Sequence, residues 1–411
     1  MVPSDAGAVI IVNSTKPIIT NLQFSSVQLP IFLAYVRDPL IEKLMIYDNF
    51  RAVRCYRSKN ITIRNIIVYN LTDLAIFLYE SNGTIYNINI ENVDGITVWG
   101  CHNLHIFNVS TRYGEYGIVS WFSHHILIED CNLSFNDYSG FLCFDSTNIT
   151  LRNIVAYNNS EKATLLDLGA IDCTDSNITL VKSLVFNNTM YGIRLMKSSI
   201  TTIESSIFDN VKDGIYGEES TIITEKSNIT RNYYGVYGYR SNITLSNSNF
   251  SENYQYGVYG YESNLEIADS TLTRNEKSGI SLAYSNATIH GNLIHKNGDS
   301  AIYFISSYVN ITHNLIYDNE EFGIHFSSSM ISDITQNTFM NNGIFMYGES
   351  IDQFIHNIEN NTVNGKPLYY LLNAENIVLS GEVGAVIIVN STSILIPVSY
   401  THLTLPTTER V

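Results

Sequence analysis

The chain has 411 residues, of which 23 are basic and 39 acidic, and its formal net charge is −16. So acidic a chain lacks the electrostatic basis for binding nucleic acid or an anionic membrane surface, and no nucleic-acid partner is expected. It contains no run of the ~18 consecutive apolar residues that a membrane-spanning helix needs, so no membrane span is expected either.

One pattern recurs along the chain from Ala8 to Ala385. A small anchor residue is followed by apolar residues one and three places later and by a polar residue about six places on, as in GIRLMKS from Gly192. The commonest step between anchors is 22 residues. Such alternation predicts a strand with one buried face, and so short a unit must stack on copies of itself to bury that face. The pattern predicts an all-β, right-handed, single-stranded parallel β-helix of about 17 coils, with three short strands per coil.

An asparagine stands at a nearly fixed distance before many anchors. The distance is four residues for Asn136, Asn188, Asn210, Asn253, Asn275, Asn297 and Asn319, and three for Asn49, Asn92 and Asn232. Asparagine suits tight turns, and its amide can bond to the equivalent amide one coil away. These positions predict an asparagine ladder.

The spacing also predicts how the chain is divided. The 30-residue step from Gly140 to Ala170 predicts a protruding loop at about residues 158–168. GAVIIVNST occurs at residues 7–15 and again at 384–392, which predicts that a new copy of the array begins near residue 384. VSYTHLTLPT, from Val398, resembles a translated sequencing-library adapter. We therefore expect residues 1–397 to form one β-helix truncated at both ends, and residues 398–411 to be foreign to it.

Stacking predicts one charged surface beside the 158–168 loop. The residues expected there are Asp145, Asp172, Asp175, Arg194 and Lys197. Paired carboxylates can serve as the acid and base of glycoside hydrolysis, and carboxylates with arginine and lysine can hold calcium and a uronate for elimination. The alternative is a solvated ladder of salt bridges.

Aromatic residues also recur at outward positions, two or four places after the anchors. The candidates for sugar binding are Trp99, Trp121, Tyr216, Tyr237, Tyr239, Tyr259, Tyr261 and Tyr303. Aromatic rows can bind sugar rings or proteins, and the alternative is self-stacking that stiffens the rod. Beneath them, glycines at three successive inward positions, Gly217, Gly238 and Gly260, predict a narrower core or a cavity.

Histidine and cysteine offer one metal-site candidate and several core positions. His102 and His124 lie at equivalent positions in adjacent coils, beside Cys101 and His125, and could hold copper or zinc. The alternative is a pair of stacked surface histidines. Cys55, Cys143 and Cys173 fall at inward positions and are expected to be core residues. No cofactor is required, and the ions suggested are calcium at the acidic cluster and copper or zinc at the histidines.

The sequence has 17 N-x-S/T sequons, which on a secreted rod are glycan acceptors. Asn60, Asn82, Asn148, Asn177, Asn242, Asn286 and Asn310 are the candidates, and a preference of asparagine and threonine for turns is the alternative.

The phrase VNGKPLYYLLNAENIVLSGEVGAVIIVNST at residues 363–392, with the recurrent NIT and YGI elements, resembles archaeal surface proteins of the NosD-like right-handed β-helix group. That group belongs to a class of carbohydrate-binding proteins and sugar hydrolases. Its eponymous member is a periplasmic protein linked to copper delivery, but none of its ligand motifs can be carried over to this chain.

Together these features predict a non-catalytic extracellular or cell-surface protein that binds a polysaccharide, a surface glycoprotein or another neighbouring surface protein through aromatic side chains. A polysaccharide hydrolase, lyase or epimerase is the second hypothesis. A periplasmic copper-handling protein is the third.

Overall fold

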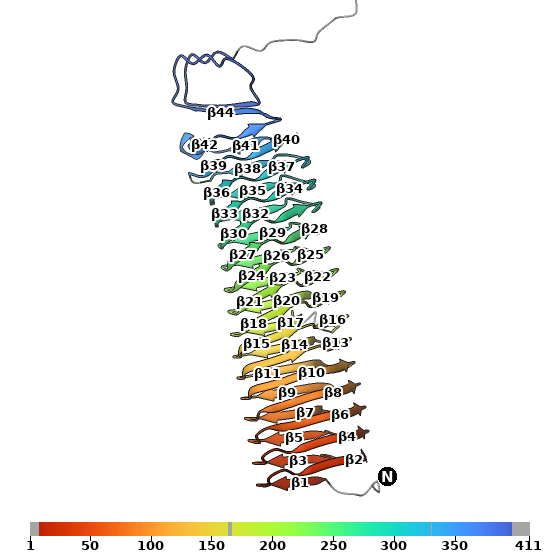
Figure 1. Cartoon of the computed structure of the whole chain (residues 1–411). Coiled ribbons are helices and arrows are strands. Elements are labelled where there is room, and N and C mark those ends of the chain that lie inside the picture. Colours follow the sequence, from red (N-terminus) through yellow and green to blue (C-terminus); the bar gives the residue numbers. More distant parts are fainter. Residues whose placement is uncertain (1–7, 163–166, 330, 397–411) are drawn as a thin grey trace, which may run out of the picture.

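A computed structural model describes residues 8–162, 167–329 and 331–396 and shows a long parallel β-solenoid (Figure 1). The chain climbs from β1 (Val9–Val12) at one end of the rod to β45 (Ala385–Val389) at the other. Each strand pairs in parallel with its equivalent one coil later, as where Ile193 lies opposite Ile215. The predicted all-β parallel fold and the 22-residue period are confirmed.

One face of the rod is a 16-stranded parallel sheet, called here the anchor sheet because each strand lies at or next to an anchor residue. Its strands are β1, β3 (Ile31–Ala34), β5 (Val53–Tyr56), β7 (Leu74–Tyr79), β9 (Asp94–Trp99), β11 (Tyr116–Trp121), β14 (Ser139–Phe144), β17 (Gly169–Thr174), β20 (Tyr191–Met196), β23 (Ile215–Glu218), β26 (Val236–Tyr239), β29 (Val258–Tyr261), β32 (Ile280–Ala283), β35 (Ile302–Ile305), β38 (Ile324–Ser327) and β41 (Ile344–Tyr347).

The remaining strands correct the expectation of three strands in every coil. The first coils have only two, because a single long strand continues through the second corner: β2 (Ile18–Ser25), β4 (Leu40–Tyr47), β6 (Ile61–Tyr69), β8 (Gly83–Glu91) and β10 (His102–Arg112). Later coils divide this segment into two: β12 (His124–Glu129) and β13 (Asn132–Ser134), β15 (Thr147–Arg152) and β16 (Val155–Tyr157), β18 (Asn177–Val181) and β19 (Leu184–Phe186), β21 (Ser199–Ile203) and β22 (Ser206–Phe208), β24 (Thr221–Glu225) and β25 (Asn228–Thr230), β27 (Asn242–Ser246) and β28 (Asn249–Ser251), β30 (Asn264–Ala268) and β31 (Thr271–Thr273), β33 (Asn286–His290) and β34 (Leu293–His295), β36 (Tyr308–Thr312) and β37 (Leu315–Tyr317), β39 (Asp333–Thr335) and β40 (Thr338–Met340).

The stack changes character after β41. A short 3-10 helix, η2 (Ile351–Phe354), precedes β42 (Asn357–Glu359) and β43 (Thr362–Val363), and β43 then turns back on β44 (Lys366–Leu372) in an antiparallel pair. β45 pairs in parallel with β44. The two copies of GAVIIVNST take the same conformation at their ends, since Asn13 and Asn390 have φ angles of 48° and 46°.

Two predicted segments are described only in part or not at all. Of the loop expected at residues 158–168, residues 163–166 lie outside the described residues. The whole of residues 398–411 also lies outside them.

The predicted asparagine ladder is present and buried. Each amide Oδ1 accepts hydrogen bonds from the asparagine one coil earlier, as where Asn210 donates from N and Nδ2 to Asn232 Oδ1 at 3.1 and 2.9 Å. The ladder contains ten asparagines: Asn136, Asn159, Asn188, Asn210, Asn232, Asn253, Asn275, Asn297, Asn319 and Asn342. Asn49 is buried but stands alone.

The prediction for Asn92 is wrong. Its side chain is exposed and donates to Asn70 Oδ1 at 3.0 Å. The next residue, Val93, fills the inward position instead.

The corners between strands explain the charged column seen in the sequence. Residues at these corners adopt the left-handed backbone conformation, with φ of 45° at Asp145, 49° at Asp175 and 50° at Lys197. Their side chains face solvent, and the next residue, a serine in many coils, turns inward. That serine accepts a backbone hydrogen bond from the coil before, as where Ser176 N donates to Ser198 Oγ at 3.0 Å. Charged residues are tolerated at these corners because they lie in water.

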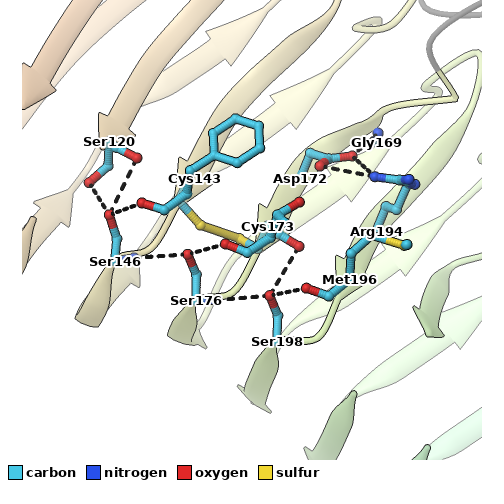
Figure 2. The surroundings of a disulfide bond; sticks show 12 residues. Ser120, Cys143, Ser146, Gly169, Asp172, Cys173, Ser176, Arg194, Met196 and Ser198 are labelled. Atoms are coloured by element: carbon cyan, nitrogen blue, oxygen red, sulfur yellow. Dashed lines mark hydrogen bonds and ion pairs between the residues drawn. A yellow bond between two sulfur atoms is a disulfide. The ribbon is translucent and has the colours of Figure 1, made fainter. Parts of the chain in front are cut away.

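Figure 2 shows a feature that the sequence did not predict, a disulfide between Cys143 and Cys173. Both residues face inward in adjacent coils, as expected, and their Cα atoms are 4.8 Å apart. The 30-residue step between them hid the fact that they are direct neighbours in the stack.

The three inward glycines do not leave a cavity. A Cβ built on Gly238 would lie 2.4 Å from Ile243 Cδ1, and one on Gly217 would lie 2.8 Å from Ile222 Cδ1. The larger side chains across the core therefore occupy the space that the glycines leave.

Candidate functional site

The most concentrated group of functional side chains lies on the outer face of the anchor sheet, from β20 to β29. We call it the tyrosine patch, and it consists of Tyr191, Tyr216, Tyr234, Tyr237, Tyr256 and Tyr259. Two columns contribute to it: residues two places after the anchors, and residues immediately before them. Only the first column was predicted from the sequence. The YGI elements carry the signal for the second, because the tyrosine before each anchor glycine points outward.

The rings of the patch form a continuous contact network. From coil to coil the ring centroids are 5.2 Å apart between Tyr191 and Tyr216, 5.3 Å between Tyr216 and Tyr237, and 5.0 Å between Tyr237 and Tyr259. Within one coil, Tyr256 and Tyr259 are 5.5 Å apart. These spacings suit aromatic contacts, and all rings except Tyr191 remain partly exposed.

The phenol groups of the patch are hydrogen-bond donors at neutral pH. Burial raises the pKa of Tyr259 to about 12 and also raises the pKa of Tyr237 above its ordinary value. Among the residues that the structure describes, the hydroxyls of Tyr234, Tyr237 and Tyr259 have no hydrogen-bond partner. These three groups can therefore bind the hydroxyls of a ligand.

A buried ion pair closes the N-terminal end of the patch. Arg194 Nη1 donates to both carboxylate oxygens of Asp172 at 3.3 Å, and Gly169 N donates to Asp172 Oδ2 at 2.9 Å (Figure 2). Asp172 is only 1% exposed, and burial raises its pKa to about 6 against the opposing effect of Arg194.

Two further acidic groups lie beside this pair. Lys212 forms an ion pair with Asp167, and Tyr191 donates to the same carboxylate at 3.3 Å. Burial raises the pKa of Asp213 to about 7. The end of the patch therefore combines paired charges with carboxyls that hold their protons more tightly than usual.

The structure divides the predicted acidic cluster. Asp172 and Arg194 meet on the anchor sheet, whereas Asp145, Asp175 and Lys197 project into solvent from the corner that follows it. The separation arises because residues two places after an anchor lie on the strand and residues five places after it lie in the left-handed turn.

The predicted aromatic residues fall into four groups. Tyr216, Tyr237 and Tyr259 lie in the patch. Trp99 and Trp121 stack at 5.5 Å in an earlier row that continues to Phe144, and Tyr239 and Tyr261 are 5.7 Å apart in a second column of the sheet. Tyr303 contacts His325 at 4.9 Å, beyond a coil that carries Ser281.

The predicted metal ligands do not converge. His102 and His124 are opposite each other and exposed, whereas Cys101 is buried on the inner side of the strand. His125 contacts Asn148 at 3.4 Å instead. In residues 8–162, 167–329 and 331–396, no group of three or more histidine, cysteine, aspartate or glutamate side chains could hold a metal ion.

The sequon asparagines lie away from the anchor sheet. Asn60, Asn148, Asn177, Asn242 and Asn286 are exposed, and Asn82 and Asn310 are partly so. Asn286 donates to Asn264, which donates to Asn242, in an exposed amide row. None of the 17 sequon asparagines falls within a strand of the anchor sheet.

The family model described as "Right handed beta helix region" matches residues 4–100, 94–245 and 234–395. The chain belongs to the right-handed β-helix family. This match agrees with the predicted handedness. Among curated proteins, no sequence relative was found.

Solved structures resemble this β-helix protein in fold alone. The periplasmic alginate epimerase AlgG, as a double mutant, is 11% identical over 81% of this chain and 78% of its own, with a TM-score of 0.39. The A-module of the Azotobacter vinelandii mannuronan C-5 epimerase AlgE4 is 13% identical over 85% and 88%, with a TM-score of 0.37. Pectate lyase Pel9A is 12% identical over 67% and 70%, with a TM-score of 0.32. Among the described residues, no helix is long and apolar enough to cross a membrane.

Proposed function

We propose that this β-helix is a non-catalytic extracellular or cell-surface protein whose tyrosine patch binds a polysaccharide or the glycan of a surface glycoprotein. The observation that carries the proposal is the patch itself. Tyr234, Tyr237 and Tyr259 combine partly exposed rings with hydroxyls that the described residues leave unpaired. Aromatic rings bind the apolar faces of sugars, and hydroxyl groups bind their edges.

The positions of the sequons also support binding at the anchor sheet, the face that carries the tyrosine patch. If the exposed sequons carry glycans, these will cover the corners and the other faces of the rod, because no sequon asparagine lies within a strand of the anchor sheet. The tyrosine patch then stays open to a partner.

Binding to a glycan array tests the proposal. Replacing Tyr237 and Tyr259 by alanine is expected to weaken glycan binding at least about tenfold, because each substitution removes a ring and a donor. The matched control is Tyr47→Ala with Tyr69→Ala, a stacked pair 5.1 Å apart on another face, which should leave binding unchanged. Equal binding by the patch variant and the intact protein would reject the proposal.

A second candidate is a polysaccharide hydrolase, lyase or epimerase centred on Asp172. Its raised pKa and its contact with Arg194 favour this candidate, because a carboxyl that titrates near pH 6 can act as an acid or a base. The test is to incubate the protein with neutral and uronate polysaccharides and to follow new reducing ends, unsaturated products and epimerised residues. Turnover that Asp172→Asn abolishes would establish an enzyme, whereas the absence of all three products would reject this candidate.

A further inference from the structure

We propose that the tyrosine patch takes an extended, neutral, β-1,4-linked hexose chain that lies along the rod axis, with one sugar per coil over three coils. This inference rests on the proposed glycan-binding function. It adds the linkage, the charge and the length of the ligand.

The spacing of the rings argues for an extended chain. The partly exposed rings of Tyr216, Tyr237 and Tyr259 follow one another at 5.3 and 5.0 Å, close to the roughly 4.8 Å that separates neighbouring strands. A pyranose chain joined through equatorial bonds at opposite ends of the ring advances by about one ring length per sugar. Each sugar can then face the tyrosine of one coil. An α-1,4-linked chain coils and loses this match after one or two sugars.

The charges around the patch argue for a neutral ligand. The two cations at its end are already paired, Arg194 with Asp172 and Lys212 with Asp167. Asp213 beside them has no cationic hydrogen-bond partner among the described residues, and Tyr216 donates to Glu218 at 3.1 Å. A polyuronate or sulfated chain would therefore meet acidic groups and no free cation. A neutral chain avoids this repulsion.

The ends of the patch argue for three sugars. At one end, Tyr191 is only 8% exposed and Lys212 Nζ lies 4.6 Å from the centre of its ring, so this ring offers no free face to a sugar. At the other end, the coil after Tyr259 carries serines at both equivalent positions, Ser278 and Ser281, and both are almost fully buried. The partly exposed aromatic surface between these ends covers three coils, those of Tyr216, Tyr237 and Tyr259.

Calorimetric titration with oligosaccharides of two to six sugars tests the inference. For cello- or manno-oligosaccharides, the Kd is expected to fall about three- to tenfold with each added sugar up to three and to change less than about twofold beyond three. Malto-oligosaccharides of the same lengths should bind at least about tenfold more weakly. Equal affinity for the malto series, or a Kd that does not depend on length, would overturn the inference.

Ser281→Tyr is a second and constructive test. Ser281 lies opposite Tyr259 on one side and Tyr303 on the other, so a tyrosine there would join the patch to the next aromatic residue. The plateau should then move from three sugars to five. An unchanged plateau in a folded Ser281→Tyr protein would contradict the assignment of one sugar to each coil.

The outcomes separate this inference from the function on which it rests. If the glycan array finds a ligand that Tyr237→Ala with Tyr259→Ala loses, but that ligand is charged or α-linked, the inference fails and the function stands. If no glycan binds at all, both fail.

Discussion

The coils before Tyr113 and the coils after Asn136 have the same period but are held together differently. In the early coils the inward position at the corner that precedes the anchor sheet is filled by Val27, Leu71 and Val93, with Asn49 as the one polar exception. In the later coils the same position is an unbroken run of buried asparagines. The tyrosine patch lies only in the later part.

The difference shows that one backbone can be stabilised by an apolar or by a polar column. The apolar column is stabilised by the burial of its side chains alone, and these side chains need no exact orientation relative to one another. The amide column gains two hydrogen bonds per rung but loses them if one residue is missing, because each amide serves the next. The later coils should therefore be more sensitive to single substitutions.

The largest expected effect comes from Asn232→Ala. It leaves Asn210 N and Nδ2 without their acceptor and Ile207 O without its donor, so the free energy of unfolding should fall by about 4 kcal/mol. Hydrogen exchange should show the loss in the surrounding coils. The control is Asn92→Gly in the early coils, which removes one exposed bond and should cost less than about 0.5 kcal/mol. Similar losses for both variants would contradict the distinction between the two regions.

The coils around Asp172 and Asp213 should respond to pH with the opposite sign to the coils around Glu42. Burial raises the pKa of Asp172 to about 6 and that of Asp213 to about 7, so between pH 4 and 7 the folded chain binds more protons than the unfolded chain. The stability of these coils should therefore fall as pH rises through that window, by about 3 kcal/mol for Asp172 alone. Asp172→Asn should remove its share of the slope.

Glu42 in the early coils provides the opposite case. A hydrogen bond from Arg64 lowers its pKa, so its contribution is present above the ordinary pKa and is lost as pH falls. Hydrogen exchange measured at pH 4, 5.5 and 7 should show the stability of the coils around Asp172 and of the coils around Glu42 changing in opposite directions. A common direction in both sets of coils would refute the assignment.

Gly238→Ala is expected to lower the free energy of unfolding by about 2 kcal/mol, because the added Cβ would lie 2.4 Å from Ile243 Cδ1. Early coils place Leu33, Cys55 and Leu78 at this inward position, so the demand for glycine is specific to the later part. Adding Ile243→Val removes the clashing methyl group and should recover part of the loss. Denaturant titration of the two single variants and the double variant checks this, and strictly additive losses would show that the two side chains do not compete for space.

The smallest expected effect is a gain in stability. Lys197 occupies a left-handed corner with φ 50°, and asparagine tolerates that conformation better than lysine does. Lys197→Asn should therefore raise the free energy of unfolding by about 0.5 kcal/mol. At the equivalent corner of an early coil, Glu80 accepts from Arg57 Nε at 2.8 Å, and Glu80→Asn would lose that bond. Urea midpoints should therefore rise only for the first variant. A rise for both would show that the ion pair contributes nothing.

The sequence predicted the period, the strand faces and most of the asparagine ladder, because these depend on offsets that stacking preserves. It did not predict the left-handed corners, because lysine, glutamate and arginine there have no local signature of that conformation. Asp145 and Asp175 were therefore placed on the same surface as Asp172. The disulfide was missed because the 30-residue step separates Cys143 from Cys173 in the sequence but not in space. Tyr191, Tyr234 and Tyr256 were missed because the columns two and four places after the anchors were followed, but not the column immediately before them.

The amide ladder can be regarded as a one-dimensional chain with two ends. All its side-chain dipoles point the same way, since each amide donates toward the next coil and accepts from the one before. At its first rung, Asn136 Oδ1 is buried and has no donor among the described residues. The free-energy cost of this unpaired end is the same whether the ladder has two rungs or ten. A single long ladder is therefore more stable than several short ones. Every internal break would create another such end, which explains why the run from Asn136 to Asn342 has no gap.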